Sequence, residues 1–172
     1  MRYFDEKTLE INANAAMPLL DDVDVTMLNA LQANGRMRRG DLAELVGLSL
    51  PAVSDRLRKL EERGYITGYT AVLDARKFGK DVTAFVQVFV DTSRHYEEFL
   101  KHVKRHPDIL ECHAVTGEGS HLLKIRTDNT AALERVLSEI QSWKEVQRTL
   151  TSIVLSTCKE TLNINIQSHT ST

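Results

Sequence analysis

The chain has 172 residues, of which 42% are apolar and 27% charged, and its formal net charge is −2. This length fits one large domain or two small ones. The sequence has no run of about 18 uncharged apolar residues that would span a membrane, and we expect no secretion signal. Cys112 and Cys158 are too few for a disulfide scaffold and lack metal-ligand spacing. We therefore expect a reducing, cytoplasmic location, with no metal and no cofactor.

Charge is distributed unevenly along the chain. The net charge of −2 argues against a strongly basic nucleic-acid binder. Residues 36–63, however, contain seven basic and five acidic side chains, a local charge of +2, whereas residues 81–172 contain ten and twelve. Because local charge sets the field at a docking surface, the first half of the chain is the better candidate for an anionic partner.

The chain is expected to begin with an arm that is followed by a helix. Residues 1–19 show no clean helical or strand period and include Pro18, which predicts a loosely docked arm. Asp21, Asp22 and Asp24 are acidic and can each cap a helix N-terminus, so a helix is expected to start near them. Apolar residues then recur at helical spacing, and Gly35 ends the helix.

Two further helical patterns follow, separated by a short turn. The second helix is expected to begin near Asp41, whose spacing from Glu44 fits a capping box, and to end at Gly47. The third is expected to be capped by Ser49 and to end at Gly64. Its buried stripe consists of Val53, Leu57 and Leu60. This arrangement predicts a helix–turn–helix.

A hairpin and a hinge are expected after the third helix. Residues 65–72 alternate loosely around a glycine, which predicts a small hairpin. That hairpin would be the wing of a winged helix–turn–helix domain over residues 20–73. Residues 74–81 are polar and contain a glycine, which indicates a hinge between domains.

Strand and helix patterns alternate over residues 82–165. The even positions from Val82 to Val90 are wholly aliphatic, which predicts a strand over residues 82–91. The other predicted elements are a helix opened by Ser93 and stopped by Pro107, a strand over 109–116 with Leu110, Cys112 and Ala114 inward, a tight turn over 117–120, a strand over 121–127, a helix from Leu133 to Ile140 and a strand over 149–158. This βαββαβ order predicts an α+β, ferredoxin-like sandwich, whose antiparallel sheet carries both helices on one face. Residues 166–172 would be a tail.

The other face of that sheet would be left open. Phe85 and Phe89 are expected to point there, with Leu122, Leu150 and Val154 as neighbours. An exposed apolar patch of this kind usually marks a partner surface. We therefore predict a two-fold homodimer that forms through the sheet.

The outward side of the third helix has a composition suited to reading duplex DNA. A helix that enters a major groove needs short residues at its N-terminal end and polar or basic groups farther along. The candidate contacts are Ser49, Pro51, Ala52, Ser54, Asp55, Arg58 and Lys59. The same pattern also fits the solvated face of a plain three-helix bundle, and periodicity alone does not separate the two readings.

Runs that point to a known family occur in both halves of the chain. They include Gly35-Arg36, Leu42-Ala43, Val46-Gly47-Leu48-Ser49, Arg56-Leu57 and Gly64-Tyr65-Ile66-Thr67-Gly68-Tyr69, and later Ala84-Phe85-Val86, His113-Ala114-Val115-Thr116-Gly117 and Ile153-Val154-Leu155. Together they resemble the Lrp/AsnC family, the leucine-responsive or feast/famine regulators, over roughly residues 20–165. The resemblance implies a winged-helix reader of double-stranded DNA. It also implies a sandwich domain that dimerises, often assembles further, as far as an octamer, and senses amino acids.

Two positions depart from the family pattern. Arg38 stands where the family usually has a capping Ser or Thr, so Arg38 becomes a candidate phosphate contact beside Arg36 and Arg39. Ser120 stands where many members carry an acid, which leaves Glu118 as the only acid in that turn.

The resemblance places an effector near the turn between the second and third predicted strands. The matching positions are Thr116, Gly117, Glu118, Gly119, Ser120 and His121. Glycines let a ligand approach the main chain, and Glu118 could accept an ammonium group. A plain β-turn without a ligand explains the same residues, so both readings stay open.

Other motifs offer no competing chemistry. His102 and His106 are four residues apart, as in a metal-binding pair, but they lack a neighbouring ligand and are expected to be surface residues. Phosphate-loop, dinucleotide, zinc and nucleophile-elbow signatures are missing, so we expect no enzyme. The sequence therefore predicts a DNA-binding transcriptional regulator controlled by a small molecule. The alternative is a small-molecule-binding assembly module without selective DNA binding.

Overall fold

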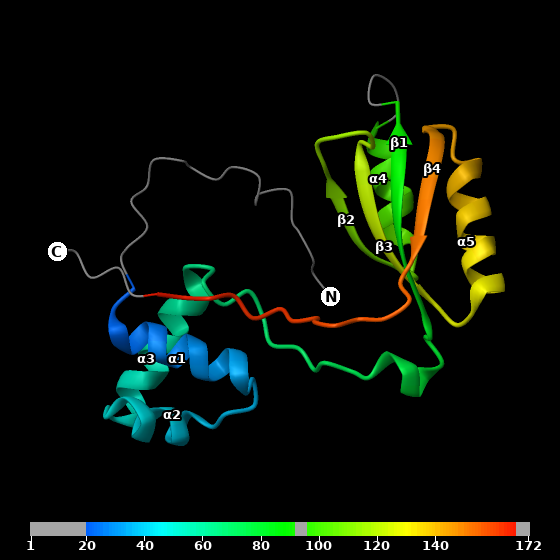
Figure 1. The fold of residues 1–172 in the computed structure, drawn as a ribbon. Coiled ribbons are helices and arrows are strands. Elements are labelled where there is room, and N and C mark those ends of the chain that lie inside the picture. Colours follow the sequence, from blue (N-terminus) through cyan, green and yellow to red (C-terminus); the bar gives the residue numbers. More distant parts are fainter. Residues whose placement is uncertain (1–19, 92–95, 168–172) are drawn as a thin grey trace. The chain divides into compact units, whose positions relative to one another are not determined.

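The computed structural model describes residues 20–91 and 96–167, which divide into two compact units (Figure 1). One unit contains residues 20–71 together with 161–167, and the other contains residues 72–160. The predicted arm, the predicted helix start at Ser93 and the end of the predicted tail lie outside the described residues. Residues 161–165, which we assigned to the second domain, group instead with the first. There the side-chain amide of Gln32 pairs with the main chain of Ile164, donating to its O at 3.1 Å and accepting from its N at 2.7 Å.

The first unit is built from three helices. They are α1 (Asp22–Ala33), α2 (Arg39–Val46) and α3 (Leu50–Glu62). The Asp21 side chain accepts a hydrogen bond from the amide of Asp24 and thereby caps α1, as predicted. Met27, Leu42 and Val53 contribute one fully buried side chain from each helix, so the three apolar stripes meet in a single core.

The second helix begins earlier than predicted. Its first residue is Arg39, its N-cap is Arg38, and no side chain caps it. The predicted start near Asp41 and the capping box with Glu44 are therefore wrong. Asp41 lies in the first turn, where its negative charge stabilises the helix N-terminus through the dipole without a capping hydrogen bond.

The predicted hairpin over residues 65–72 is also wrong, because this segment forms no strand. The amides of Tyr65 and Ile66 turn back to the carbonyl of Leu60, and residues 67–73 are exposed. A two-stranded ribbon without a buried face is only marginally stable, which explains why no strand pairing forms here. The hinge is more regular than predicted, since it contains the 3-10 helix η2 (Ala75–Phe78), capped by the side chain of Asp74.

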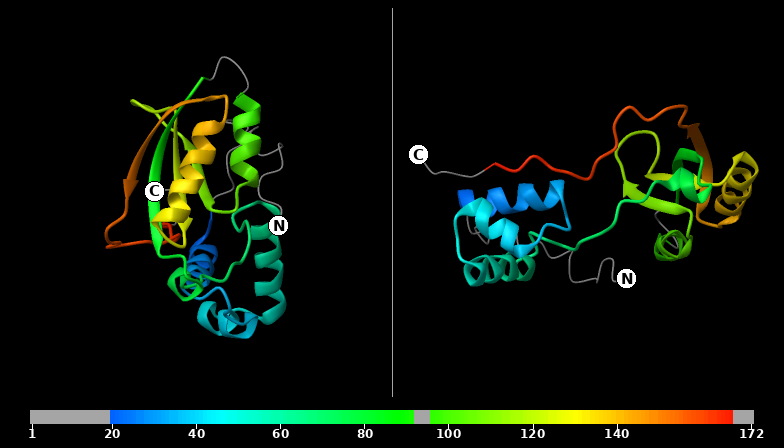
Figure 2. Two further views of the ribbon diagram at one scale, coloured as in Figure 1. Left: turned by 90° about the vertical axis from the view of Figure 1, so that its right-hand side faces the viewer. Right: turned by 90° about the horizontal axis from the view of Figure 1, so that it is seen from below.

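The second unit has the predicted βαββαβ order. Its elements are β1 (Val82–Val90), α4 (Tyr96–Arg105), β2 (Ile109–Ala114), β3 (His121–Thr127), α5 (Thr130–Ser142) and β4 (Val146–Ile153). The strands form one antiparallel sheet in the order β2-β3-β1-β4. Both helices cover the same face of this sheet (Figure 2). The α+β, ferredoxin-like prediction is therefore confirmed.

The alternating aliphatic residues of β1 determine which face of the sheet carries the core of this unit. Ala84, Val86 and Val88 are fully buried against the helices, as the aliphatic even positions predict. Phe99 from α4 and Ile140 from α5 complete this core and are themselves fully buried. The odd positions of β1 consequently face the side of the sheet that carries no helix.

Two strand predictions need correction. In β2, Leu110 is 51% exposed and Ala114 is also exposed, whereas Ile109 and Cys112 pack on the core. A register shift between Ile109 and Glu111 explains Leu110, because a bulge there reverses which side chains face inward. Ala114 keeps the phase of Cys112 but is the last residue of β2 and is left exposed at its end. The last strand runs from Val146 to Ile153 rather than over residues 149–158, since its partner β1 begins at residue 82 and pairing ends just after Ile153, where the amide of Val154 donates to the carbonyl of Thr83.

Among residues 20–91 and 96–167, no helix is long and apolar enough to cross a membrane. The same residues hold no group of three or more His, Cys, Asp or Glu side chains arranged to bind a metal ion.

Candidate DNA-binding helix and effector loop

Helix α3 is anchored by one side and leaves its other side outward. The side-chain oxygen of Ser49 accepts from the amide of Ala52 and caps the helix. The predicted stripe is confirmed, because Val53, Leu57 and Leu60 are all buried. The predicted contact residues lie away from this stripe: Ser49, Pro51, Arg58 and Lys59 are exposed, and Ala52, Ser54 and Asp55 are half-buried.

The turn between α2 and α3 gives the pair its helix–turn–helix geometry. Gly47 has a φ of 66°, a left-handed conformation that favours glycine. The amide of Leu48 donates to the carbonyl of Ala43 at 3.0 Å and closes the turn. Ala43 is buried, so its small side chain lets α2 approach the rest of the core closely.

An ion-pair clamp fixes the orientation of α3 on α1. Nη1 of Arg56 lies 2.8 Å from a carboxylate oxygen of Asp24 and 2.7 Å from one of Asp21. Hydrogen bonds to Asp24 and Asp21 raise the pKa of the Arg56 guanidinium. Our sequence reasoning counted Arg56 only as a local positive charge. Its position between the stripe residues Val53 and Leu57 was the available signal that it faces α1.

The outward charges of α3 bind one another. Asp55 accepts from Nη2 of Arg58 at 2.5 Å and contacts Nζ of Lys59 at 2.7 Å, one oxygen for each cation. Nη1 of Arg58 donates to both carboxylate oxygens of Glu62, at 2.7 and 2.8 Å. Hydrogen bonds from Lys59 and Arg58 hold the pKa of Asp55 below its usual value. Arg58 and Lys59 are therefore outward and paired at the same time.

Three further arginines precede or begin α2. Arg36, Arg38 and Arg39 are exposed, and none of them forms an ion pair with a carboxylate of the described residues. Their guanidiniums are free to contact an anion that approaches this end of the first unit. This is the property that a phosphate contact requires.

The six predicted effector residues divide into two groups. Thr116, Gly117 and Glu118 are exposed in the β2–β3 loop, and Gly117 has a φ of 115°. Gly119 is buried, and an added Cβ there would lie 3.3 Å from Cβ of Gln87 on β1. Gly119 thus lets the loop pack closely on the sheet, and only the first three residues point outward.

The side chains of Ser120 and His121 belong to a buried hydrogen-bond network. Oγ of Ser120 donates to the carbonyl of Val88 at 3.1 Å and accepts from the amide of Val90 at 3.0 Å. Because its single proton is used on Val88, Nδ1 of His121, 3.1 Å away, must donate to Oγ. Nε2 then accepts from the hydroxyl of Tyr96 at 3.1 Å. Burial lowers the pKa of His121, which is consistent with this neutral form.

All five predicted interface residues lie on the open face of the sheet. Gln87 pairs in register with Leu122 on β3 and Leu150 on β4, so these two leucines lie on either side of it. Phe85 is 39% and Leu150 55% exposed. Phe89 is partly covered by Arg148, whose Cζ lies 3.9 Å above the ring centroid. Val154 directly follows β4 and faces the same side as Leu150, and its amide donates to the carbonyl of Thr83.

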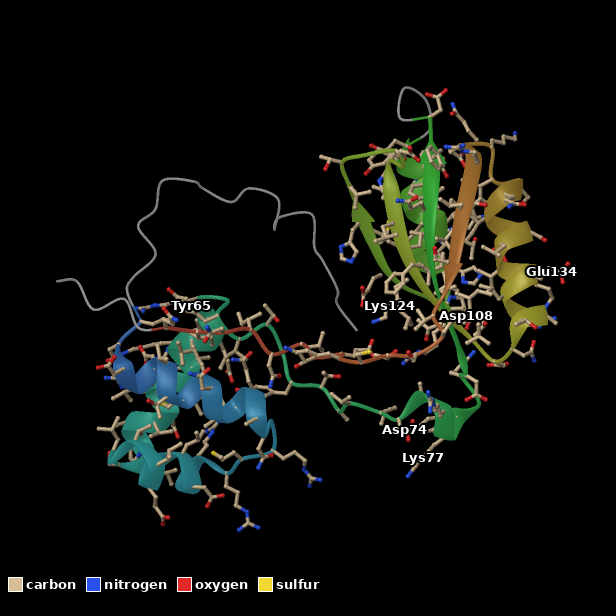
Figure 3. The ribbon with its side chains drawn as sticks, viewed as in Figure 1. Tyr65, Asp74, Lys77, Asp108, Lys124 and Glu134 are labelled. Carbon is tan, nitrogen blue, oxygen red and sulfur yellow. The ribbon has the colours of Figure 1, made fainter. Side chains whose placement is uncertain are left out.

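The open face also carries a charged cluster. Lys124 on β3 is labelled in Figure 3, and its Nζ binds carboxylate oxygens of both Glu111 and Glu160. Nη2 of Arg126 lies 3.6 Å from Glu160, so Glu160 joins two cations of β3. The open face thus mixes exposed apolar side chains with polar ones, since Phe85 lies between Lys124 and Ser152 in register and Gln87 lies between the two leucines.

His102 of α4 and His106, which directly follows this helix, have structural partners. The ring of His102 stacks on Trp143 with 5.0 Å between centroids. Nδ1 of His106 accepts from the amide of Asp108, and its Nε2 lies 3.4 Å from Glu139. Our prediction of surface residues is right for His102, which is exposed, and wrong for His106, whose side chain is only 9% exposed.

Comparison with known proteins matches both units separately. Residues 20–67 match a model described as a winged helix-turn-helix, DNA-binding, and residues 83–164 match the Lrp/AsnC ligand binding domain. The proline dehydrogenase transcriptional activator of Rhizobium radiobacter is 39% identical over 145 residues, covering 83% of this chain and 93% of the activator. The leucine-responsive regulatory protein of Escherichia coli is 32% identical over 151 residues, an alignment that covers 86% of this chain and 92% of the Escherichia coli protein.

Solved structures agree with these matches. A transcriptional regulator from Neisseria meningitidis, solved as a complex with L-methionine, superposes with a TM-score of 0.81 at 32% identity, covering 85% of this chain and 96% of that one. The fold and the matches together define a two-domain, DNA-binding transcriptional regulator with a winged helix–turn–helix. This chain belongs to the Lrp/AsnC family. The predicted family, the regulator function and the assignment to a non-enzyme class are thereby confirmed.

Proposed function

We propose that the chain acts as a homodimer that reads a near-palindromic DNA site with the outward side of α3 and responds to an amino acid. The observation that carries this proposal is the orientation of α3: its stripe is buried, and Pro51, Arg58 and Lys59 stay outward. Arg36, Arg38 and Arg39 would position the protein on phosphates, while Ser54, Asp55, Arg58 and Lys59 would discriminate bases. Because DNA is its target, the protein would work in the cytoplasm.

The dimer would form through the open face of the sheet. The face offers Phe85, Leu122 and Leu150 around Gln87, and these side chains would be buried by a second copy in a two-fold arrangement. A two-fold dimer presents two recognition helices, so the half-sites should lie about one helical turn apart, or a multiple of it. Assembly of such dimers into an octamer is the further step that the family resemblance implies.

The effector would bind at the exposed part of the β2–β3 loop. Thr116 offers a hydroxyl, Gly117 an approachable main chain, and Glu118 a carboxylate for an ammonium group. The side chains of Ser120 and His121 are committed to the buried network, so they would support the loop rather than contact the ligand. The relative from Neisseria meningitidis was solved with L-methionine, which makes methionine the first amino acid to test.

One experiment tests the regulator function and its control together. Binding of the full chain to the DNA upstream of its own coding region would be titrated against a scrambled duplex, across a salt series, with and without each common amino acid. We expect a clear preference for the upstream DNA and a steep loss of affinity with salt. We also expect at least one amino acid to change the affinity. Equal binding to both duplexes, combined with heat of binding for an amino acid, would support the assembly module instead.

A further inference from the structure

We propose that Asp55 and Glu62 are specificity-determining residues of α3, which act by holding Arg58 and Lys59 in ion pairs along the helix. In this state α3 offers no free cation to a DNA phosphate. A matching base edge would replace the carboxylates and release the cations for base contacts. This inference rests on the proposed function, because it concerns how the same helix rejects incorrect DNA.

The arrangement leaves no basic residue of α3 unpaired. Arg58 is held at both ends, by Asp55 through Nη2 and by Glu62 through Nη1. Lys59 takes the second oxygen of Asp55 at 2.7 Å. Arg56, the remaining cation within Leu50–Glu62, is committed to the clamp on α1. The outward set of Asp55, Arg58, Lys59 and Glu62 therefore carries no net charge.

The free arginines of the first unit lie elsewhere. Arg36, Arg38 and Arg39 form no ion pair with a carboxylate of residues 20–91 or 96–167. The structure thus separates two tasks within one unit. General attraction to phosphates belongs to the α1–α2 connection, the start of α2 and the exposed C-cap residue Arg63, which has no ion pair with a carboxylate of the described residues. Discrimination belongs to the outward side of α3.

The strength of these ion pairs suits a reversible block. Arg58, Lys59, Asp55 and Glu62 have side chains that are 46–58% exposed, and exposed pairs at helical spacing are weak. Exchanging a carboxylate for a phosphate gives a cation a similar partner, so nonspecific DNA gains little. A base edge that accepts two hydrogen bonds from one guanidinium gains more, because its geometry matches the fork of the arginine. Selectivity then arises partly from penalising incorrect DNA.

The test compares two neighbouring carboxylates of α3. Glu62→Gln removes a carboxylate that holds Arg58, whereas Glu61→Gln removes one whose partner is the hydroxyl of Tyr69, 2.9 Å away. Both variants change the net charge by the same amount, and glutamine at 61 can still accept from Tyr69. Asp55→Asn is a second test variant, because it loosens both Arg58 and Lys59. Circular dichroism and thermal melting would establish that each variant folds as the wild type does.

Affinity would be measured for the upstream duplex and for a scrambled duplex of equal length. We expect Glu62→Gln to bind the scrambled duplex about two- to fivefold more tightly than wild type. The slope of log affinity against log salt for this duplex should steepen by about 0.9, the value for one additional phosphate contact. Affinity for the upstream duplex should change less, so the ratio of the two falls. Asp55→Asn should steepen the scrambled-duplex slope in the same direction, and Glu61→Gln should leave slope and ratio near the wild-type values.

The outcomes separate this inference from the proposed function. If wild type prefers the upstream duplex but Glu62→Gln and Glu61→Gln behave alike, the proposal that Asp55 and Glu62 restrain Arg58 and Lys59 is wrong, and the regulator function stands. If wild type shows no preference at all, both are overturned, since there is then no selectivity for the carboxylates to protect.

Discussion

Replacing Ser120 with alanine should destabilise the sheet domain, because its hydroxyl holds three groups together. Removing Oγ takes away the acceptor of the Val90 amide and of the ring N–H of His121, and it also removes the donor to the Val88 carbonyl. Two buried donors lose their partners, at about 1–2 kcal/mol each. Because the Val88 carbonyl still accepts from the amide of Ser120, its loss adds little. The free energy of unfolding should therefore fall by about 2–4 kcal/mol.

Urea denaturation at fixed protein concentration measures this loss. Trp143 is the only tryptophan of the chain and is buried near Phe99, so its fluorescence reports on this domain. With a denaturant slope of about 2 kcal/mol/M, the urea midpoint should fall by about 1–2 M while the slope stays constant. Thr116→Ala, at an exposed position of the same loop, is the matched control and should change stability by less than about 0.5 kcal/mol. A similarly small change for Ser120→Ala would refute the network and return Ser120 to the list of ligand contacts.

Three other predictions follow from the same structure. Leu150→Glu should shift the dimer toward the monomer in sedimentation equilibrium, because it places a charge on the open face. Leu45→Glu, at an equally exposed leucine of α2, is the control and should leave the dimer unchanged. A dimer unaffected by Leu150→Glu would exclude the open face as its interface. Burial lowers the pKa of His121 below its ordinary 6.5, so its contribution to stability is complete above that pH and is lost as pH falls toward the folded-state pKa. The melting temperature should therefore drop on acidification below pH 6.5, and a variant with His121→Phe that shows an equal drop would contradict this assignment. Burial raises the pKa of the Cys112 thiol to about 11. At neutral pH a thiol reagent should therefore label the exposed Cys158 quickly and Cys112 only on unfolding. Rapid labelling of both thiols in the native protein would contradict the packing of Cys112 on the core of the sheet domain.

The sequence was most informative where one face of an element is buried. The aliphatic even positions of β1 and the stripe of α3 predicted both elements and their orientation, because burial imposes a period that the sequence displays. The Leu110 error had a different origin. A bulge between Ile109 and Glu111 reverses the alternation within β2, and no residue type in that run announces it.

Pairing between distant residues was the part of the site that the sequence left hidden. Ser120 and His121 fall in a turn that matches an effector position, but their hydrogen bonds run to Val88, Val90 and Tyr96, which are 25 to 32 positions away in the chain. The clamp of Arg56 on Asp21 and Asp24 is likewise long-range. By contrast, the pairs of Arg58 with Asp55 and Glu62 are at i,i+3 and i,i+4 spacing, so the sequence carried that signal.

The most direct test of DNA reading by α3 is a base-by-base affinity profile of wild type and Arg58→Ala. Each base pair of the bound upstream duplex would be substituted in turn, and the change in affinity recorded for both proteins. We expect Arg58→Ala to bind the parent duplex about 5- to 150-fold more weakly and to lose base preference at one position in each half-site, while the other positions keep theirs. Identical profiles for the two proteins, whatever their absolute affinities, would contradict base reading by this side of the helix.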